Sequence, residues 1–191
     1  MTTQPIKAIA IGASAGAVQA LLRILPALPV GYPLPVLIVV HVPSDRSNAL
    51  VLLFQSKCQL AVKEAEDKED ITGGVIYFAP SDYHLLVEDE GTLALSSDES
   101  VNHSRPAIDV LLETAADAYG PALAGIVLTG ANHDGAAGLR AVADAGGIAI
   151  VENPAGAQMP TMPAAALAAC PSAKAMTLDD ITSYLLKLAA T

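Results

Sequence analysis

The chain has 191 residues, of which 52% are hydrophobic, and this is enough apolar material for one sizeable core. The formal net charge is -10 and only 10 residues are Lys or Arg, which argues against a nucleic-acid partner because phosphate contacts need clustered cations. Aromatic residues make up 4%, and the aliphatic composition is typical of helices packed on a parallel sheet.

Cysteine spacing and hydropathy indicate in which cellular compartment the protein is expected. Cys58 and Cys170 lie far apart and fit no metal or redox motif, so we expect reduced thiols. The N-terminus lacks the charged and long apolar regions of a signal peptide, and no apolar run reaches membrane-spanning length. No linker or repeat divides the sequence. We therefore expect one soluble, cytoplasmic domain over residues 1–191, without membrane insertion.

The first 41 residues predict a strand, a helix and a second strand. Residues 7–11 form a short β-branched stretch that stops at Gly12, which indicates a buried strand entering a tight turn. Residues 17–25 place apolar side chains at helical spacing, and prolines follow. Residues 35–41, "PVLIVVH", are a continuous apolar run, typical of a central parallel strand. Together these segments predict a βαβ unit.

The middle of the chain departs from this alternation. Residues 47–58 have helical periodicity, and the charged residues 63–70, "KEAEDKED", predict a solvated loop or an edge. Residues 73–96 alternate apolar with polar side chains and contain an "EDEGT" turn. This segment predicts short antiparallel strands that include a hairpin.

Strand and helix alternate again from Pro106. We expect helices at 106–120 and 135–146, strands at 122–130 and 147–153, and helical segments at 162–170 and 178–190. The order of elements predicts a doubly wound α/β fold. Its sheet is mostly parallel, with helices on both faces and an antiparallel hairpin addition.

The segment from Gly12 to Gly16, "GASAG", fits the G-x-S-x-G pattern between a strand and a helix. In this context Ser14 is a candidate nucleophile on a strained turn. The alternative is a tight turn in which the serine caps the helix. A dinucleotide loop fits less well, because Ser14 and Ala17 stand at glycine positions and His41 at the acidic one; no Walker lysine follows Gly12.

A nucleophilic serine needs a base and a carboxylate that orients the base. His41 ends the second predicted strand, and Asp134 lies in the "LTGANHDGAAG" turn after a later strand. A hydrogen-bonded structural histidine and a helix-capping aspartate are the alternatives. Because Ser14, His41 and Asp134 all follow predicted parallel strands, we expect them at one edge of the sheet, where such folds bind ligands.

Three further residues are weighed for this site. His133 competes with His41 as base, although it adjoins Asp134 in one turn, and His84 is expected to be structural or at the rim. Arg105 precedes a predicted helix and either pairs with Asp109 or holds a carboxylate or carbonyl of the substrate.

Five ordered motifs resemble the catalytic domain of the bacterial chemotaxis protein-glutamate methylesterases, the CheB family. They are "IGASAGAVQAL", "VVHVP", "IYFAPSDYHLLV", "HSRPAIDVLL" and "VLTGANHDGAAGL", followed by a Met-Pro segment, "MPTMPAAAL". The resemblance covers nearly the whole chain. It implies hydrolysis of glutamate γ-methyl esters on the cytoplasmic helices of chemoreceptors, with glutamine deamidation as a related activity.

The resemblance also implies roles for individual residues. Ser14 is the nucleophile, His41 the general base and Asp134 the group that orients it. Backbone amides near Ala15 and Ala131 stabilise the oxyanion, Arg105 and Met162 contact the substrate, and no cofactor or metal is implied.

The sequence departs from the family pattern in places. The family's Ser-Thr-Gly-Gly turn continues here with Ala15, and its Thr-Gly-Met-Gly turn has Ala131 and Asn132 in the last two positions; Thr161 replaces a glycine. The first strand begins near Met1, so we expect no receiver domain and either constitutive activity or control by a separate regulatory protein. An esterase for another ester, or a silent module that binds receptors or signalling proteins, remains the alternative.

Overall fold

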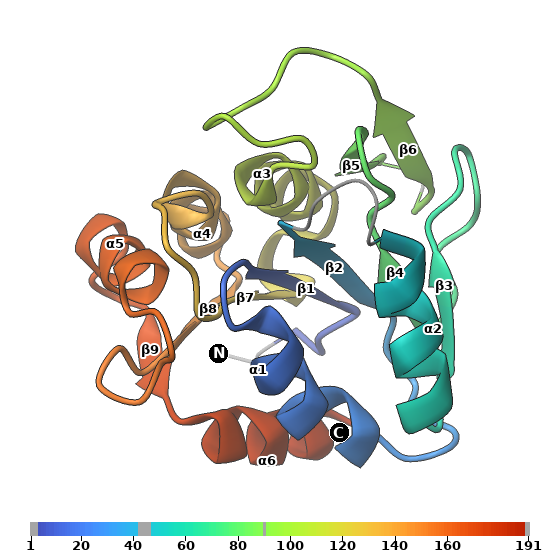
Figure 1. Cartoon of the computed structure of the whole chain (residues 1–191), viewed down its shortest axis with the longest axis horizontal. Helices are drawn as coiled ribbons and strands as arrows, with labels where there is room; N and C mark the ends of the chain where they lie inside the picture. Colours follow the sequence, from blue (N-terminus) through green and yellow to red (C-terminus); the bar gives the residue numbers. More distant parts are fainter. Residues whose placement is uncertain (1–3, 42–46, 90, 190–191) are drawn as a thin grey trace.

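A seven-stranded parallel sheet forms the centre of the computed structural model, which describes residues 4–41, 47–89 and 91–189 (Figure 1). The strands lie in the order β3-β4-β2-β1-β7-β8-β9. Their bounds are β1 Ala8–Ala13, β2 Val36–Val40, β3 Ala61–Glu64, β4 Val75–Phe78, β7 Leu123–Val127, β8 Ile148–Glu152 and β9 Lys174–Met176.

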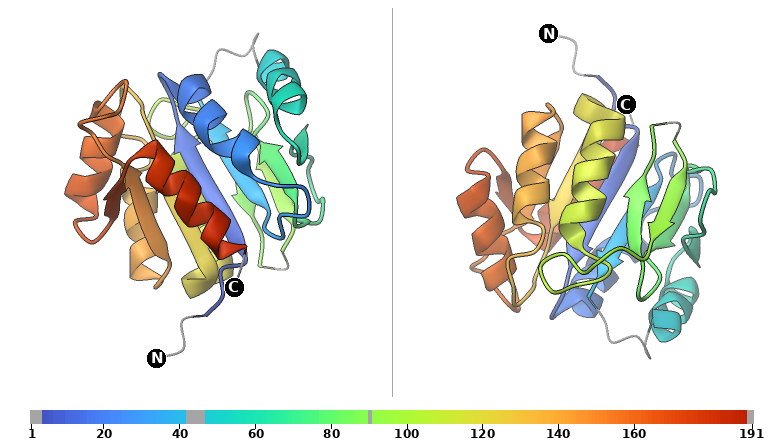
Figure 2. Two further views of the ribbon diagram at one scale, coloured as in Figure 1. Left: turned by 90° about the horizontal axis from the view of Figure 1, so that it is seen from below. Right: turned by 90° about the horizontal axis from the view of Figure 1, so that it is seen from above.

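Helices cover both faces of this sheet (Figure 2). On one face lie α1 (Ala17–Ile24), α2 (Ser47–Lys57) and α6 (Leu178–Leu188), and on the other lie α3 (Ile108–Tyr119), α4 (Ala136–Asp144) and α5 (Thr161–Ala169). Short 3-10 turns follow α1 and α3, at Leu25–Ala27 and Gly120–Ala122.

The alternation of strand side chains explains why there are two core layers. In β1, Ile9 and Ile11 pack into the layer under α1 and α6, whereas Ala8 and Ala10 pack into the layer under α3 and α4. All six residues of β1 are buried, so this strand is apolar on both faces. At the carboxyl end of β1, where the site lies, Gly12 leaves room for Ile108 at the start of α3, since a Cβ there would lie 2.1 Å from Ile108 Cγ2.

The predicted α/β class is confirmed, including the antiparallel hairpin. The hairpin pairs β5 (His84–Val87) with β6 (Leu93–Ser96) and packs on α3, where the Val87 N–H donates to Thr114 Oγ1 at 3.1 Å. In the part of the chain that the structure describes, no helix has the length and apolarity needed to cross a membrane.

One part of the strand assignment was wrong. Residues 75–78, expected in an antiparallel block, form β4, which runs parallel between β2 and β3. The charged segment at 63–70, expected as a solvated loop or an edge, begins inside β3, which is an edge strand of the sheet. The sequence also gave no prediction for β9, a three-residue edge strand with no buried side chain. Edge strands bury little, so their hydrophobic pattern is weak.

Candidate active site

Three turns meet at the carboxyl ends of the central strands. Ser14 follows β1, His41 follows β2, and the strand β7 leads into the turn that carries Asp134. Backbone hydrogen bonds tie the turns together, since the His41 N–H donates to the Ala13 carbonyl at 3.2 Å and the Ser14 N–H donates to the Thr129 carbonyl at 2.9 Å. The strand order reverses beside β1, which is where open α/β sheets bind ligands.

The Ser14 turn is held in shape by Gly16. This residue has φ 87°, and a Cβ there would lie 2.9 Å from the Gln158 side chain and 3.0 Å from that of Thr129. The helix α1 begins at Ala17 with Gly16 as its N-cap and without a side-chain cap, so the expected alternative of a helix-capping serine was wrong. Ser14 is half-buried, and its hydroxyl makes no hydrogen bond to any described residue.

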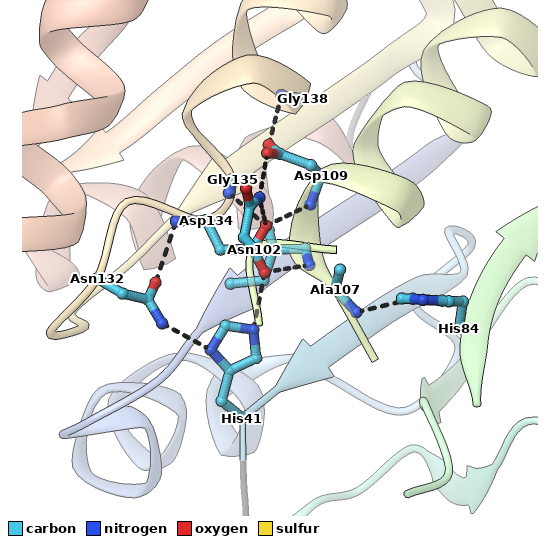
Figure 3. A network of polar contacts seen from close by, with 10 residues as sticks. His41, His84, Asn102, Ala107, Asp109, Asn132, Asp134, Gly135 and Gly138 are labelled. Atoms are coloured by element: carbon cyan, nitrogen blue, oxygen red, sulfur yellow. Dashed lines mark hydrogen bonds and ion pairs between the residues drawn. The ribbon is translucent and has the colours of Figure 1, made fainter. Parts of the chain in front are cut away.

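His41 and Asp134 form a close pair (Figure 3). His41 Nε2 lies 2.8 Å from Asp134 Oδ2, and the Asp134 side chain is completely buried. An ionised carboxylate only accepts hydrogen bonds, so Nε2 carries the proton and Nδ1 keeps its lone pair. In this tautomer Nδ1 is the atom that can accept a proton from a nucleophile.

The Asp134 carboxylate also lies at the N-terminus of α3. Its Oδ2 accepts the Ile108 N–H at 2.7 Å, and its Oδ1 accepts the Asp109 N–H at 3.1 Å. Burial by itself would raise the pKa of Asp134, but the hydrogen bonds from His41, from these two amides and from Asn102 outweigh it and lower the pKa below its usual range. Asp134 therefore stays ionised beside His41.

Asp134 was also considered as a cap for the helix that follows it, and that alternative was wrong. The N-cap of α4 is Gly135, at φ 93°, so Asp134 is not the capping residue of this helix. The carboxylate instead serves α3, which precedes it in the chain. The first amides of a helix attract negative charge, so α3 helps to hold an ionised group beside the histidine.

Asn102 lies between two buried carboxylates that the sequence did not mark as a pair. Its Nδ2 donates to Asp109 Oδ2 at 2.7 Å and to Asp134 Oδ1 at 2.8 Å. Asp109 Oδ1 accepts the Gly138 N–H at 2.7 Å, so this carboxylate holds the first turn of α4. Burial raises the pKa of Asp109, with the charge of Asp134 as a further cause. Asn102 thereby reduces the repulsion between the two acids.

Asn132 contacts the other nitrogen of His41. The Asp134 N–H donates to Asn132 Oδ1 at 3.0 Å, which fixes the orientation of the amide because a backbone N–H can only donate. Asn132 Nδ2 then lies 3.3 Å from His41 Nδ1 and donates to it. The contact supports the same tautomer that Asp134 requires. The sequence pattern marks the turn that contains Asn132 but carries no signal for the role of its amide.

Two backbone amides near the site are available for an oxyanion. The N–H groups of Ala15 and Ala131, both exposed residues, donate to no acceptor in the described ranges. They lie in the Ser14 turn and in the turn after β7, which a hydrogen bond from Thr129 Oγ1 to the Ala15 carbonyl joins at 2.9 Å. The resemblance implies that these two amides stabilise an oxyanion, and that role stays a prediction.

Arg105 and Met162, the two residues expected to contact the substrate, both make contacts within the protein. Arg105 Nη1 donates to the carbonyls of Ser97 and Asp98, both at 3.0 Å, so the guanidinium holds the loop before α3. Its suggested pairing with Asp109 was wrong, because Asn102 and Gly138 donate to that carboxylate instead. Met162 is fully buried, and its side chain packs against Gly130. Contact of either residue with a substrate stays a prediction.

The other two histidines considered for the site, His84 and His133, differ in burial and in hydrogen bonding. His84 is buried, with Nε2 bonded to the Glu99 carbonyl at 2.9 Å and Nδ1 accepting the Ala107 N–H at 3.2 Å, so it is structural. His133 is exposed, whereas His41 is the histidine bonded to Asp134. Among the described residues, no group of three His, Cys, Asp or Glu side chains is arranged to hold a metal ion.

Comparison with known proteins covers almost the entire chain. The CheB methylesterase family model matches residues 9–185. A relative in Leptospira interrogans is 41% identical over 182 residues, which cover 95% of this chain and 94% of the relative. The protein-glutamate methylesterase/protein-glutamine glutaminase 1 of Paramagnetospirillum magneticum is 36% identical over 99% of this chain and 51% of its own length.

A solved structure agrees with these relatives. The crystal structure of the Thermotoga maritima CheB methylesterase catalytic domain superposes with a TM-score of 0.91 at 32% identity, covering 97% of this chain and 100% of that one. The resemblance drawn from the five motifs is confirmed, and so is the prediction of a carboxylic ester hydrolase at the level of the family. This chain belongs to the CheB methylesterase family.

Proposed function

We propose that the chain hydrolyses glutamate γ-methyl esters on the cytoplasmic helices of chemoreceptors, through Ser14, His41 and Asp134. The observation that carries this proposal is the 2.8 Å bond between His41 Nε2 and the buried Asp134 carboxylate, which leaves Nδ1 as the basic atom. Relatives named protein-glutamate methylesterases support the choice of ester.

In the first half of the reaction, Ser14 Oγ attacks the ester carbonyl and its proton passes to His41 Nδ1. The negative charge that develops on the carbonyl oxygen is met by the Ala15 and Ala131 N–H groups, which have no other acceptor in the described part of the chain. The C–O bond to the methoxy group then breaks, and His41 returns the proton to give methanol and an acyl-serine.

In the second half, water attacks the acyl-serine, His41 accepts a proton from the water, and Ser14 regains its proton when its ester bond breaks. The products are glutamate and free enzyme. Throughout, Asp134 holds the Nε2–H tautomer and stabilises the positive charge of the protonated ring. A glutamine amide would follow the same steps with ammonia as the leaving group, and the relatives' names include this activity.

No hydrogen bond joins Ser14 Oγ to His41 within the described residues. In unliganded enzymes such catalytic bonds are often long and tighten when substrate binds. Asn132 Nδ2 occupies Nδ1 in this state, at the long distance of 3.3 Å, so a serine hydroxyl that approaches Nδ1 displaces a weak donor.

The experiment that tests this function measures methanol release from methylated receptor membranes. We expect Ser14→Ala and His41→Ala to lower the rate by at least roughly 1,000-fold, because each removes a member of the triad. His133→Ala is the matched control for the histidine, since His133 is exposed in the turn beside Asp134 and is expected to keep the wild-type rate.

Unchanged methanol release in Ser14→Ala would refute the assignment. Hydrolysis of small esters without demethylation of receptors would point to an esterase for another substrate. A fluorophosphonate probe that fails to label Ser14 would instead indicate a binding module with an unactivated serine.

A further inference from the structure

A hollow lies beside the Ser14 turn and has no part in the reaction described above. It consists of two cavities of about 260 and 220 Å³ at the end of β8, the end of α1 and the start of α6. The cavities share the lining residues Arg23, Glu152, Gly156 and Leu178. The smaller one is also lined by Gly16 and Thr129, which belong to the two turns of the candidate active site.

The Glu152 carboxyl is the unusual group in this hollow. Glu152 is only 3% exposed, yet it lines both cavities. Oε2 accepts the Thr129 N–H at 2.8 Å, and Oε1 has no hydrogen-bond partner among the described residues. Burial raises the pKa of Glu152. Oε1 is not among the fully buried atoms, so it faces the hollow, and a ligand that brings an N–H would give it a charge-assisted hydrogen bond.

The charges around Glu152 favour a cation. Arg23 is the one cationic side chain among the described residues that line the hollow, and its Nη2 lies 2.6 Å from Asp179 Oδ1. Both partners are largely exposed, so this pair stands at the solvent side and its charges balance. Glu152 remains as the charge without a counterion.

We propose that this hollow binds an ammonium or guanidinium group, with Glu152 Oε1 accepting its N–H. Each cavity is smaller than the roughly 300–1,000 Å³ typical of small-molecule sites, which suits one side chain or a small amine. On a protein substrate the group is a Lys or Arg side chain. The assignment of the group to a substrate side chain rests on the proposed esterase function.

The position of Gly16 restricts where such a residue stands in the substrate. Gly16 is two positions after Ser14 in the chain, so their Cα atoms are at most about 7.6 Å apart. On a helical substrate, residues three or four apart have Cβ atoms about 5–6 Å apart. The cationic side chain is therefore expected three or four residues from the esterified glutamate.

Binding is tested first without catalysis. The Ser14→Ala protein is titrated with n-butylammonium and n-butylguanidinium, with butanol as a neutral probe, and amide NMR shifts are followed. We expect saturable shifts at Gly16, Thr129 and Gly156 with both cations and not with butanol. Glu152→Gln keeps an oxygen for the Thr129 N–H and removes the charge, so it should weaken binding by roughly 10-fold or more.

Glu64→Gln is the control, because Glu64 lies on β3 at the opposite side of the sheet. The proposal is overturned if butanol binds as well as the cations, if the shifts map elsewhere, or if Glu152→Gln binds as tightly as Glu64→Gln. None of these outcomes depends on ester hydrolysis, so the site can fail while the esterase stands, and the reverse.

Kinetics then distinguish a protein side chain from a free amine. In methylated helical peptides, replacing a Lys three or four residues from the ester with Gln should raise KM by roughly 10-fold in the wild type. In Glu152→Gln the same replacement should change KM by less than about twofold. Saturable binding of the amines without a lysine effect on KM would limit the site to free amines and overturn the substrate part.

Discussion

Asp134 Oδ2 accepts the Ile108 N–H at 2.7 Å, so a residue that follows β7 closes the N-terminus of α3, the α-helix that precedes this strand. The same oxygen lies 2.8 Å from His41 Nε2. One carboxylate therefore fixes the start of a helix and the tautomer of the candidate base.

We expect Asp134→Asn to reduce methanol release by on the order of 10⁴-fold, the loss seen when the orienting carboxylate of a serine triad becomes an amide. An amide offers one acceptor oxygen where the carboxylate accepts from two amides of α3 and from His41. Purified variant and wild type are compared in the receptor assay, with circular dichroism as the check on folding. A folded variant with more than a tenth of wild-type activity would contradict this role.

Asn102→Gly tests the bridge between the two buried acids. Asn102 has φ 52°, which glycine tolerates, so the substitution mainly removes the amide. We expect a loss of about 1.5–3 kcal/mol in the free energy of unfolding at pH 7, because two charged hydrogen bonds disappear. Urea unfolding measures this loss of stability. His103→Gly, at a residue with φ 60°, is the control for the effect of introducing a glycine at a positive φ.

The same variant should respond to pH in a defined direction. The pKa of Asp134 is lower in the folded protein, so its ionisation stabilises the fold above the unfolded value of about 3.9. That stability is lost as the pH falls through the lower folded value. Because Asn102 contributes to the shift, the difference between wild type and Asn102→Gly should shrink on acidification; a difference that grows would argue against it.

Asn132→Ala should increase the reactivity of Ser14. Asp134 already fixes the His41 tautomer, and the Asn132 amide competes for Nδ1 at 3.3 Å. Removing a neutral hydrogen bond of about 0.5–1.5 kcal/mol predicts a rise of roughly 2–10-fold in the rate of fluorophosphonate labelling. His133→Ala in the same turn should leave the rate unchanged. Slower labelling of Asn132→Ala would mean that the amide orients the base instead.

Gly12→Ala should destabilise the protein next to the site. A Cβ on Gly12 would lie 2.1 Å from Ile108 Cγ2, and Ile108 supplies an amide to Asp134. Overpacking of this kind costs about 1–3 kcal/mol, and displacement of Ile108 should also slow Ser14 labelling.

A double-mutant cycle with Ile108→Ala checks the cause of this effect. Because the truncation removes the clashing methyl group, the double variant should lose less stability than the sum of the single variants. Additive losses would place the clash elsewhere. Gly156→Ala, where the nearest atom is 3.8 Å away, is the control for stability.

Local patterns in the sequence identified much of the fold. The apolar runs at β1 and β2, the helical spacing at α1 and the glycines around Ser14 are short-range signals, and each led to an element found near its predicted position. The sequence carries no signal for the edge strand β9 and indicates only a loop or an edge where β3 ends, because edge strands bury few side chains and so have little periodicity.

The sequence by itself determined that Ser14, His41 and Asp134 each follow a strand, because a strand and the side chain that comes after it are features of one local segment. Tertiary structure alone decided what surrounds them. The capping of α3 by Asp134, the Asn102 bridge and the Glu152 hollow each join residues from separate elements. Polar side chains form such contacts without periodicity, since their partners are chosen by the packing of helices on the sheet and not by chain neighbours.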